Sequence, residues 1–253
     1  MLRTRVIPVL LLKDESLVKT VQYGKYGYIG DPINTCRIFN ELEVDELSFL
    51  DISASKEKKD PDYKILQEIS NECFMPLSYG GGVDSFAKAE KVFKIGFEKI
   101  ILNSASFTHP EIITEIARVY GSQAVVIAVD VRKSFWGKYE VFGVSGTVNY
   151  KKNPVDWVKE MEDRGAGEIL LTSIDREGTW KGLDLDLTRK ITDNTILPVI
   201  AHGGAGTVQH IAEAVQSAHA SAVALGSMVV YQKQGLGVLV NFPDKMVLEE
   251  ILF

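Results

Sequence analysis

The chain has 253 residues, of which 45% are apolar and 25% are charged, and its formal net charge is −6. This length suits one large domain, and the composition is that of an ordinary globular protein. The negative charge, with Lys and Arg spread along the chain, argues against a nucleic-acid-binding surface. No apolar stretch approaches the roughly 20 residues that cross a bilayer, and no signal-type N-terminus is present. Cys36 and Cys73 lack metal-ligand spacing, which predicts reduced thiols in a cytoplasmic protein.

Short apolar runs alternate with longer amphipathic stretches along the chain. The runs expected to form strands are Val6–Leu12, Leu47–Ile52, Met75–Tyr79, Lys99–Leu102, Ala124–Val129, Glu168–Ser173, Leu197–Ala201 and Ala222–Leu225. Helices are expected over Pro32–Glu43, Tyr63–Cys73, Ser85–Ile95, His109–Tyr120, Pro154–Arg164, Asp186–Ile191 and Val208–Ser217. Continuous apolar runs are typical of parallel strands buried on both faces. This pattern predicts an α/β fold, a (β/α)8 TIM barrel that forms a single domain over residues 1–253.

The two halves of the chain repeat each other with an offset of 122 or 123 positions. The matched segments are Gly81 with Gly204, Asn103-Ser104 with Gly226-Ser227, and Asp51-Ile52-Ser53 with Ser173-Ile174-Asp175. Three matches in register predict an internal two-fold repeat of half-barrels, each with four βα units.

Glycine-rich turns follow the third and fourth expected strands, and they recur after the seventh and eighth. The turns are Gly80-Gly81-Gly82, Asn103-Ser104-Ala105-Ser106, Gly203-Gly204 and Gly226-Ser227. Glycines let backbone N–H groups approach an anion closely, although tight βα turns also require glycine in any barrel. Paired sets in symmetry-related positions predict two phosphate sites across the barrel mouth, and therefore a bisphosphate substrate.

Asp130 ends the fifth expected strand, where the active-site face of a barrel lies. A partly buried carboxylate there is suited to acid–base chemistry, and the alternative is a helix N-cap. Asp51, Asp175 and Lys19 are similarly placed and have either binding or structural roles. His202 could contact a phosphate or simply be packed. No metal-ligand cluster, dinucleotide fingerprint or P-loop is present, so we expect no metal and no cofactor.

The half-barrel repeat aligns Leu11 with Asp130. Acid–base chemistry that uses two carboxylates needs an Asp at both positions, because leucine neither donates nor accepts a proton. Loss of one of two such groups costs about 10²–10⁴-fold in rate.

Several longer motifs point to one family. They are Arg5-Val6-Ile7-Pro8, Gly30-Asp31-Pro32, Gly80-Gly81-Gly82, Gly121-Ser122-Gln123-Ala124-Val125-Val126, residues 165–176 and Ile200-Ala201-His202-Gly203-Gly204-Ala205-Gly206. With these motifs the chain resembles the cyclase subunit of imidazole glycerol phosphate synthase (HisF) from residue 3 to about residue 230.

The resemblance implies a two-fold repeated barrel that uses ammonia to cleave a phosphorylated ribulosyl-formimino nucleotide and close an imidazole ring. It implies a glutaminase (HisH-like) partner on the N-terminal barrel face and an ammonia gate formed by Arg5, Glu46, Lys99 and Glu168, although charges at strand starts are usually solvated. The implied substrate-binding residues are Lys19, Asp51, Gly81, Gly82, Asn103, Ser104, Thr172, Asp175, Gly178, Gly203, Gly204, Gly226 and Ser227. The implied catalytic positions are those of Leu11 and Asp130.

The chain also departs from the family pattern. Val9 replaces a cysteine, the segment after Gly235 is unlike the usual last helix, and the aromatic insertion Ser134-Phe135-Trp136-Gly137 is expected to reshape the substrate mouth. With Leu11, these departures favour a paralogue that supplies ammonia for acetamidino-sugar synthesis in surface polysaccharides. The alternatives are a histidine-pathway cyclase, a conduit module without chemistry, and a stand-alone isomerase.

Overall fold

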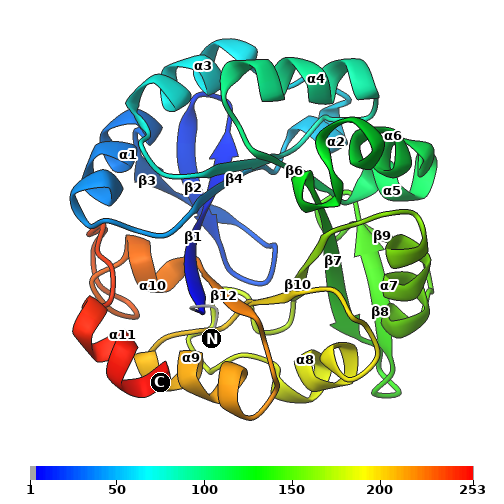
Figure 1. The fold of residues 1–253 in the computed structure, drawn as a ribbon. Coiled ribbons are helices and arrows are strands. Elements are labelled where there is room, and N and C mark those ends of the chain that lie inside the picture. Colours follow the sequence, from blue (N-terminus) through cyan, green and yellow to red (C-terminus); the bar gives the residue numbers. More distant parts are fainter. Residues whose placement is uncertain (1–3, 253) are drawn as a thin grey trace.

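In the computed structural model, which describes residues 4–252, eight parallel strands close into a barrel (Figure 1). The strands, in spatial order, are β1 (Arg5–Lys13), β4 (Leu47–Asp51), β5 (Leu77–Gly80), β6 (Lys99–Leu102), β7 (Val125–Lys133), β10 (Glu168–Ser173), β11 (Val199–His202) and β12 (Ala222–Leu225). Pairing of β12 with β1, in the register Arg5 to Ala222, closes the ring. The predicted TIM barrel is confirmed, because continuous apolar strands need cover on both faces.

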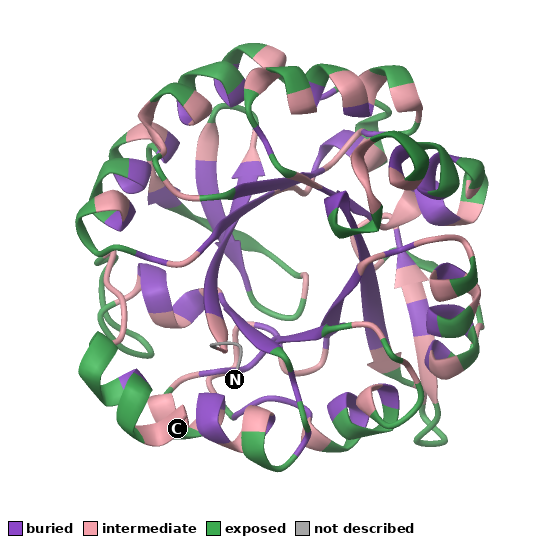
Figure 2. Ribbon diagram, in the orientation of Figure 1, coloured by how far each residue is buried: buried purple, intermediate pink, exposed green. Residues whose placement is uncertain are grey.

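An outer ring of helices covers the barrel. It consists of α1 (Pro32–Glu41), α3 (Tyr63–Glu72), α4 (Phe86–Ile95), α6 (Glu111–Tyr120), α7 (Pro154–Asp163), α8 (Leu185–Thr192), α9 (Val208–Gln216) and α11 (Lys245–Leu252). Their inner faces are buried and their outer faces exposed (Figure 2), as the amphipathic pattern predicts. Local signals fix several starts: Asp31 caps α1, accepting a hydrogen bond from the Asn34 N–H at 2.8 Å.

The segment after Gly235 ends in a helix despite its departure from the family pattern. Asp244 caps α11 by accepting a hydrogen bond from the Met246 N–H at 2.8 Å. Gln216 of α9 donates its side-chain amide to the Ile251 carbonyl at 2.8 Å, which fixes the new helix against its neighbour. The segment after Gly235 therefore ends in a helix that packs against α9.

Smaller elements are inserted after several strands. They are the strands β2 (Ser16–Thr20), β3 (Tyr26–Gly30), β8 (Tyr139–Gly143) and β9 (Val148–Asn149), the short helices α2 (Ala54–Glu57), α5 (Ser104–Thr108) and α10 (Ser227–Val230), and the 3-10 turn Ser122–Ala124. The antiparallel strands β2 and β3 follow β1, and β8 and β9 follow β7. Both additions therefore extend the end of the barrel at which the strands finish.

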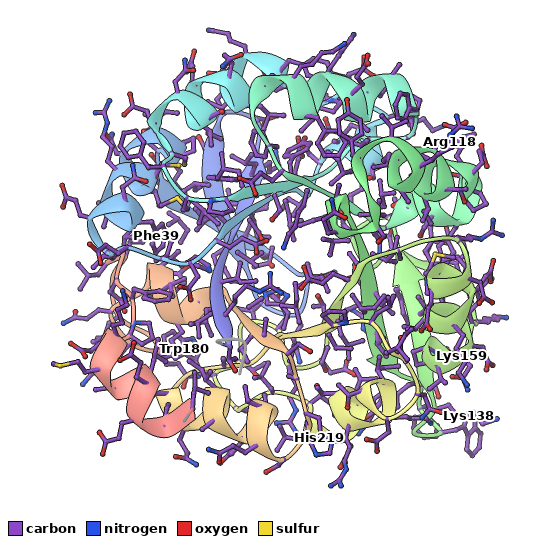
Figure 3. The ribbon with its side chains drawn as sticks, viewed as in Figure 1. Phe39, Arg118, Lys138, Lys159, Trp180 and His219 are labelled. Atoms are coloured by element: carbon purple, nitrogen blue, oxygen red, sulfur yellow. The ribbon has the colours of Figure 1, made fainter. Side chains whose placement is uncertain are left out.

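The aromatic insertion is not part of the substrate mouth, which corrects the sequence-based expectation. Phe135 and Trp136 lie in the turn between β7 and β8 and are 95% and 84% exposed. In Figure 3 the neighbouring Lys138 marks this turn at the outer rim of the molecule. The insertion lengthens β7 and β8 into a ribbon whose tip points away from the barrel axis.

The buried apolar side chains form two separate layers. The larger layer fills the space between strands and helices, with Phe39 and Trp157 among its fully buried members. The smaller layer occupies the barrel interior and comes from alternate residues of several barrel strands, with Val18 of β2: Ile7, Val9, Leu11, Val18, Ile101, Val126, Ala128, Leu170, Ile200, Ala222 and Ala224. Within residues 4–252 no helix is both long and apolar enough to cross a membrane.

Candidate functional site

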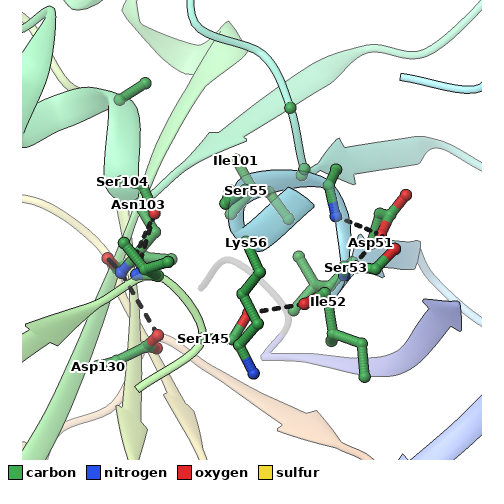
Figure 4. A pocket seen from close by; sticks show the side chains of 18 of the residues that line it. Asp51, Ile52, Ser53, Ser55, Lys56, Ile101, Asn103, Ser104, Asp130 and Ser145 are labelled. Atoms are coloured by element: carbon green, nitrogen blue, oxygen red, sulfur yellow. Dashed lines mark hydrogen bonds between the residues drawn. The ribbon is translucent and has the colours of Figure 1, made fainter. Parts of the chain in front are cut away.

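A cavity of about 650 Å³ opens where the barrel strands end. Its volume falls in the range of small-molecule sites. The predicted site residues that line it are Leu11, Asp51, Gly81, Gly82, Asn103, Ser104, Asp130, Thr172 and His202. Figure 4 shows Asp51 and Asp130 on opposite sides of this cavity, with Asn103 and Ser104 beside Asp130. The strand-end position that suggested a functional role for Asp130 thus places it in the main concave site.

Asp130 is buried and surrounded by hydrogen-bonding groups. The Asn103 side-chain amide donates to its carboxylate at 3.4 Å, and the hydroxyls of Thr172 and Tyr23 lie near enough to favour its charged form. Burial, aided by the charge of Glu177, outweighs these hydrogen bonds and raises the pKa of Asp130 to about 7. At neutral pH the carboxyl is therefore poised between its acid and base forms, as proton transfer to or from a substrate requires.

A buried ion pair joins Lys19 of β2 to Glu177, which follows β10. Glu177 also accepts hydrogen bonds from the Thr20 hydroxyl and the Tyr23 N–H, both at 3.2 Å. Our reading of the sequence named Lys19 but not Glu177. The available signal was an acidic residue immediately after the motif that ends at Arg176, in the loop that leaves the sixth barrel strand.

His202 completes the polar group at the end of β11. Its Nδ1 lies 3.0 Å from the Thr172 hydroxyl, and the ring is buried. Burial and the nearby charge of Lys19 lower the pKa of His202 to about 3, so the imidazole is neutral. A Cβ at Gly226 would lie 2.8 Å from Lys19 Cε and 3.8 Å from His202 Nε2, so the second-half turn is packed against these two side chains.

The glycine turns of the two halves differ in their access to the cavity. Gly81 and Gly82 line it with positive φ angles of +132° and +68°, and a Cβ at Gly82 would lie 2.5 Å from the Lys59 carbonyl oxygen. Gly203 and Gly204 also have positive φ, but they are not among the lining residues. The remaining second-half candidates, Gly178, Gly226 and Ser227, do not line the cavity either. The structure therefore opens the first-half pair of predicted anion turns to the cavity.

Asp51 and Asp175 make contacts that organise loops. One oxygen of Asp51 accepts hydrogen bonds from the Ser53 N–H and hydroxyl, both at 2.8 Å, and from the Ala54 N–H at 3.0 Å, which orders the turn into α2. Asp175 accepts from the Lys133 N–H at 2.8 Å and does not line the cavity. The structural alternative accounts for Asp175, whereas Asp51 combines a structural role with a place in the cavity wall.

The four charges implied as a gate close into a ring at the opposite end of the barrel. Arg5 donates to Glu46 at 2.7 Å and also to Glu168, while Lys99 donates to Glu46 at 2.9 Å and to Glu168 at 3.0 Å. Each charge thus contacts two opposite charges, which makes the burial of both glutamates tolerable. Above the ring lie small and apolar side chains of the barrel interior, together with Ser48 and Ser78, whose hydroxyls are 2.6 Å apart.

No cluster of three or more His, Cys, Asp or Glu side chains suited to a metal ion occurs in the described part of the chain.

The sequence matches the histidine biosynthesis protein family over residues 5–235. A Pseudomonas aeruginosa protein provisionally named imidazole glycerol phosphate synthase subunit hisF2 is 47% identical over 244 residues, which cover 96% of this chain and 97% of that protein. A Leptospira borgpetersenii protein provisionally named imidazole glycerol phosphate synthase subunit HisF is 46% identical over 96% of both chains. A Vibrio vulnificus protein with the provisional name subunit hisF3 is 44% identical over 96% of this chain and 94% of its own length.

Proposed function

The chain belongs to the histidine biosynthesis protein family, and we propose that it is the HisF-like, cyclase-type subunit of a glutamine-dependent complex. In this proposal a glutaminase (HisH-like) partner binds the N-terminal barrel face and releases ammonia there. The ammonia passes through the barrel and reacts in the cavity around Asp130 with a phosphorylated substrate.

The observation that carries this proposal is the continuous arrangement of charged ring, apolar interior and polar cavity along the barrel axis. The charged ring consists of Arg5, Glu46, Lys99 and Glu168. Its charges are paired with one another, so we do not assign substrate binding to it. Behind it, side chains such as Val126 and Ala224 provide an environment in which an ion is costly and neutral ammonia is not. A lumen of this kind favours passage of a small neutral nucleophile to Asp130.

The cavity walls support an anionic substrate. Gly81 and Gly82 provide closely approachable backbone, and Lys56, Lys58 and Lys59 add positive charge to the cavity lining. In this proposal Gly81 and Gly82 contact a phosphate group of the substrate, and Asn103 and Ser104 contribute hydrogen-bonding groups to that phosphate. The buried Lys19 beside Gly226 serves the second phosphate-binding turn.

For the acceptor, we favour ammonia supply for converting a sugar acetamido group to an acetamidino group. The supporting observation is Leu11, which lines the cavity where a second proton-transfer carboxylate would stand and offers no titratable group. The alternative is ring closure on the ribulosyl-formimino nucleotide in histidine biosynthesis. Its support is the intact surrounding of Asp130, whose pKa of about 7 suits acid–base work.

The two acceptors are separated by assaying the purified chain with ammonium salt and the ribulosyl-formimino nucleotide. Clear turnover by the unchanged chain establishes cyclase activity and refutes the preference for a sugar acceptor. If turnover is absent and appears in Leu11→Asp, the rest of the cyclase site is intact and Leu11 is the reason for the altered role. Asp130→Asn, which removes the remaining acid, serves as the negative control. Leu12→Asp is not a suitable control, because Leu12 lies in the core between strands and helices and the change would destabilise the fold.

The conduit is tested in the copurified complex with Lys99→Met, which opens the charged ring, and Lys94→Met as the matched control. Lys94 is an exposed lysine on α4 that also pairs with a glutamate. We expect Lys99→Met to lower product formed from glutamine while leaving product formed from added ammonium unchanged. Equal loss with both nitrogen sources, or no loss with either, contradicts a role of the ring in ammonia transfer.

A further inference from the structure

A second proton-bearing side chain, Tyr23, reaches Asp130 from the turn between β2 and β3. The turn has an unusual backbone, because Gln22 and Tyr23 are consecutive non-glycine residues with φ angles of +52° and +58°. Non-glycine residues rarely have a backbone with positive φ. Such conformations persist where contacts with the surrounding structure impose them. The contacts of this turn therefore identify what holds Tyr23 in place.

The loop after β10 holds the turn. The backbone N–H of Gln22 donates to the Glu177 carbonyl at 2.9 Å. The side-chain amide of Gln22 donates to the Asp175 carbonyl at 2.7 Å. The Tyr23 N–H donates to the Glu177 carboxylate at 3.2 Å. The Tyr23 ring lies against Gly146, where a Cβ would stand 2.7 Å from Tyr23 Cδ2. Two segments far from Tyr23 in the chain, the loop after β10 and the segment at Gly146, thus hold this turn and its phenol ring.

Tyr23 lines the same cavity as Asp130 and Thr172, and its phenol hydroxyl lies near enough to both side chains to interact with them. We propose that Tyr23 is the second proton-transfer group of this site and relays a proton between the bound ligand and Asp130. This inference rests on the proposed function in that it assumes a reaction of ammonia at Asp130. It goes beyond that function by assigning to a loop tyrosine the work that Leu11 cannot do.

The relay step is balanced without any further reactant. When ammonia adds to the carbon of a C=O or C=N group, the C–N bond forms as the π bond breaks, and the π electron pair moves to the oxygen or nitrogen of that group. The newly attached nitrogen then carries a positive charge and a proton to be removed. That proton moves to the Tyr23 oxygen as the Tyr23 O–H proton moves to the Asp130 carboxylate. Tyrosine is neutral before and after the step, the nitrogen becomes neutral, and Asp130 becomes the carboxylic acid, ready to protonate a leaving group.

The charges around the pair support a neutral tyrosine. Burial, together with the negative charges of Asp130 and Glu177, raises the pKa of Tyr23, so the phenol keeps its proton. Lys19 faces the same space but its charge is paired with Glu177, and His202 is neutral. The remaining neighbours of Asp130, Asn103 and Thr172, are uncharged hydrogen-bonding groups. Tyr23 therefore donates to the carboxylate form of Asp130 and stabilises it.

The experiment follows the ionisation of Asp130 by NMR in the full-length chain labelled with 13C at aspartate carboxyl groups. Asp130→Asn assigns the signal, Tyr23→Phe removes the phenol hydroxyl, and Tyr28→Phe is the control. Tyr28 is an exposed tyrosine on β3 of the same hairpin that does not line the cavity. The titration midpoint of Asp130, near pH 7 in the unchanged chain, should rise by about one pH unit in Tyr23→Phe and stay constant in Tyr28→Phe.

An unchanged Asp130 midpoint in Tyr23→Phe overturns the proposal, because the hydrogen bond on which the relay depends is then absent. This result does not depend on any reaction, so it is separable from a failure of the proposed function. Where ammonium-dependent turnover is measured, Tyr23→Phe should lower it at least tenfold, and Leu11→Asp should remove most of that loss. Full turnover in Tyr23→Phe also overturns the relay.

Discussion

Asp130 should make the stability of the protein depend on pH in a direction opposite to that of carboxylates paired with a positive charge. A carboxyl that is paired in the folded state has a lowered pKa and loses its stabilising effect in acid. Asp130 has a raised pKa, because burial disfavours its charged form more than Tyr23, Thr172 and Asn103 favour it. The replacement Asp130→Asn keeps the shape and the hydrogen bonds of the neutral form and removes the charge.

The magnitude follows from the difference between the folded pKa of about 7 and the ordinary value of 3.8. Between these values the folded chain binds more protons than the unfolded chain, so its stability falls as pH rises. Three pH units at about 1.4 kcal/mol each correspond to about 4 kcal/mol, fully expressed above pH 7. Asp130→Asn should therefore match the unchanged protein at pH 4 and exceed its free energy of unfolding by up to about 4 kcal/mol at pH 8.

The assay is urea unfolding of both proteins between pH 4 and pH 8.5, followed by circular dichroism. Comparing the two proteins at each pH cancels the contribution of other groups, including His202, whose lowered pKa destabilises the fold as pH drops below 6.5. A free-energy difference that stays constant with pH, or that favours aspartate at pH 8, refutes the reasoning that burial dominates the environment of Asp130.

Three further predictions follow from the packing. Lys19→Met should lower the free energy of unfolding by about 3–5 kcal/mol because it leaves Glu177 buried and unpaired, whereas Lys13→Met, which breaks an exposed pair with Asp14, should cost less than about 1 kcal/mol in the same urea assay. Gly82→Ala should destabilise the fold more than Gly137→Ala. Both glycines have positive φ, but a Cβ meets the Lys59 carbonyl oxygen only at Gly82. Equal melting temperatures for the two variants contradict this close approach. Asp244→Ala should cost about 1 kcal/mol by removing the cap of α11, and an unchanged melting temperature shows that packing alone holds this helix.

The barrel was predictable because its information is local. Runs such as Lys99–Leu102 and Glu168–Ser173, each with an apolar stretch behind a charged first residue, coincide with β6 and β10 to the residue. The charged ring was expected only from the family resemblance, since charged residues at strand starts are usually solvated. The hairpin of β2 and β3 was missed because its turn Val21–Lys25 has no periodic pattern. The aromatic insertion was assigned to the substrate mouth because the local sequence does not determine the direction of the chain beyond Asp130.

The site itself is only partly local. Asp130 was visible because it ends an apolar run, but its partners Tyr23 and Glu177 lie in loops that the closed barrel brings together. Their contact requires the turn after β2 to meet the loop after β10, more than 150 positions further along the chain. Neither residue type nor spacing along the chain predicts such a contact. The raised pKa of Asp130 and the lowered pKa of His202 are consequences of this assembly and of burial.

The central claim, that ammonia reaches the cavity through the barrel, is tested most directly by isotope competition in the complex with the glutaminase. Unlabelled glutamine is supplied together with an excess of 15N-ammonium in the medium, and the nitrogen incorporated into product is analysed by mass spectrometry. The account predicts that the product carries mainly unlabelled nitrogen, and that Ala224→Leu, which fills the apolar interior, shifts incorporation toward 15N. Product labelled in proportion to the ammonium of the medium, before any change to the barrel, contradicts the claim.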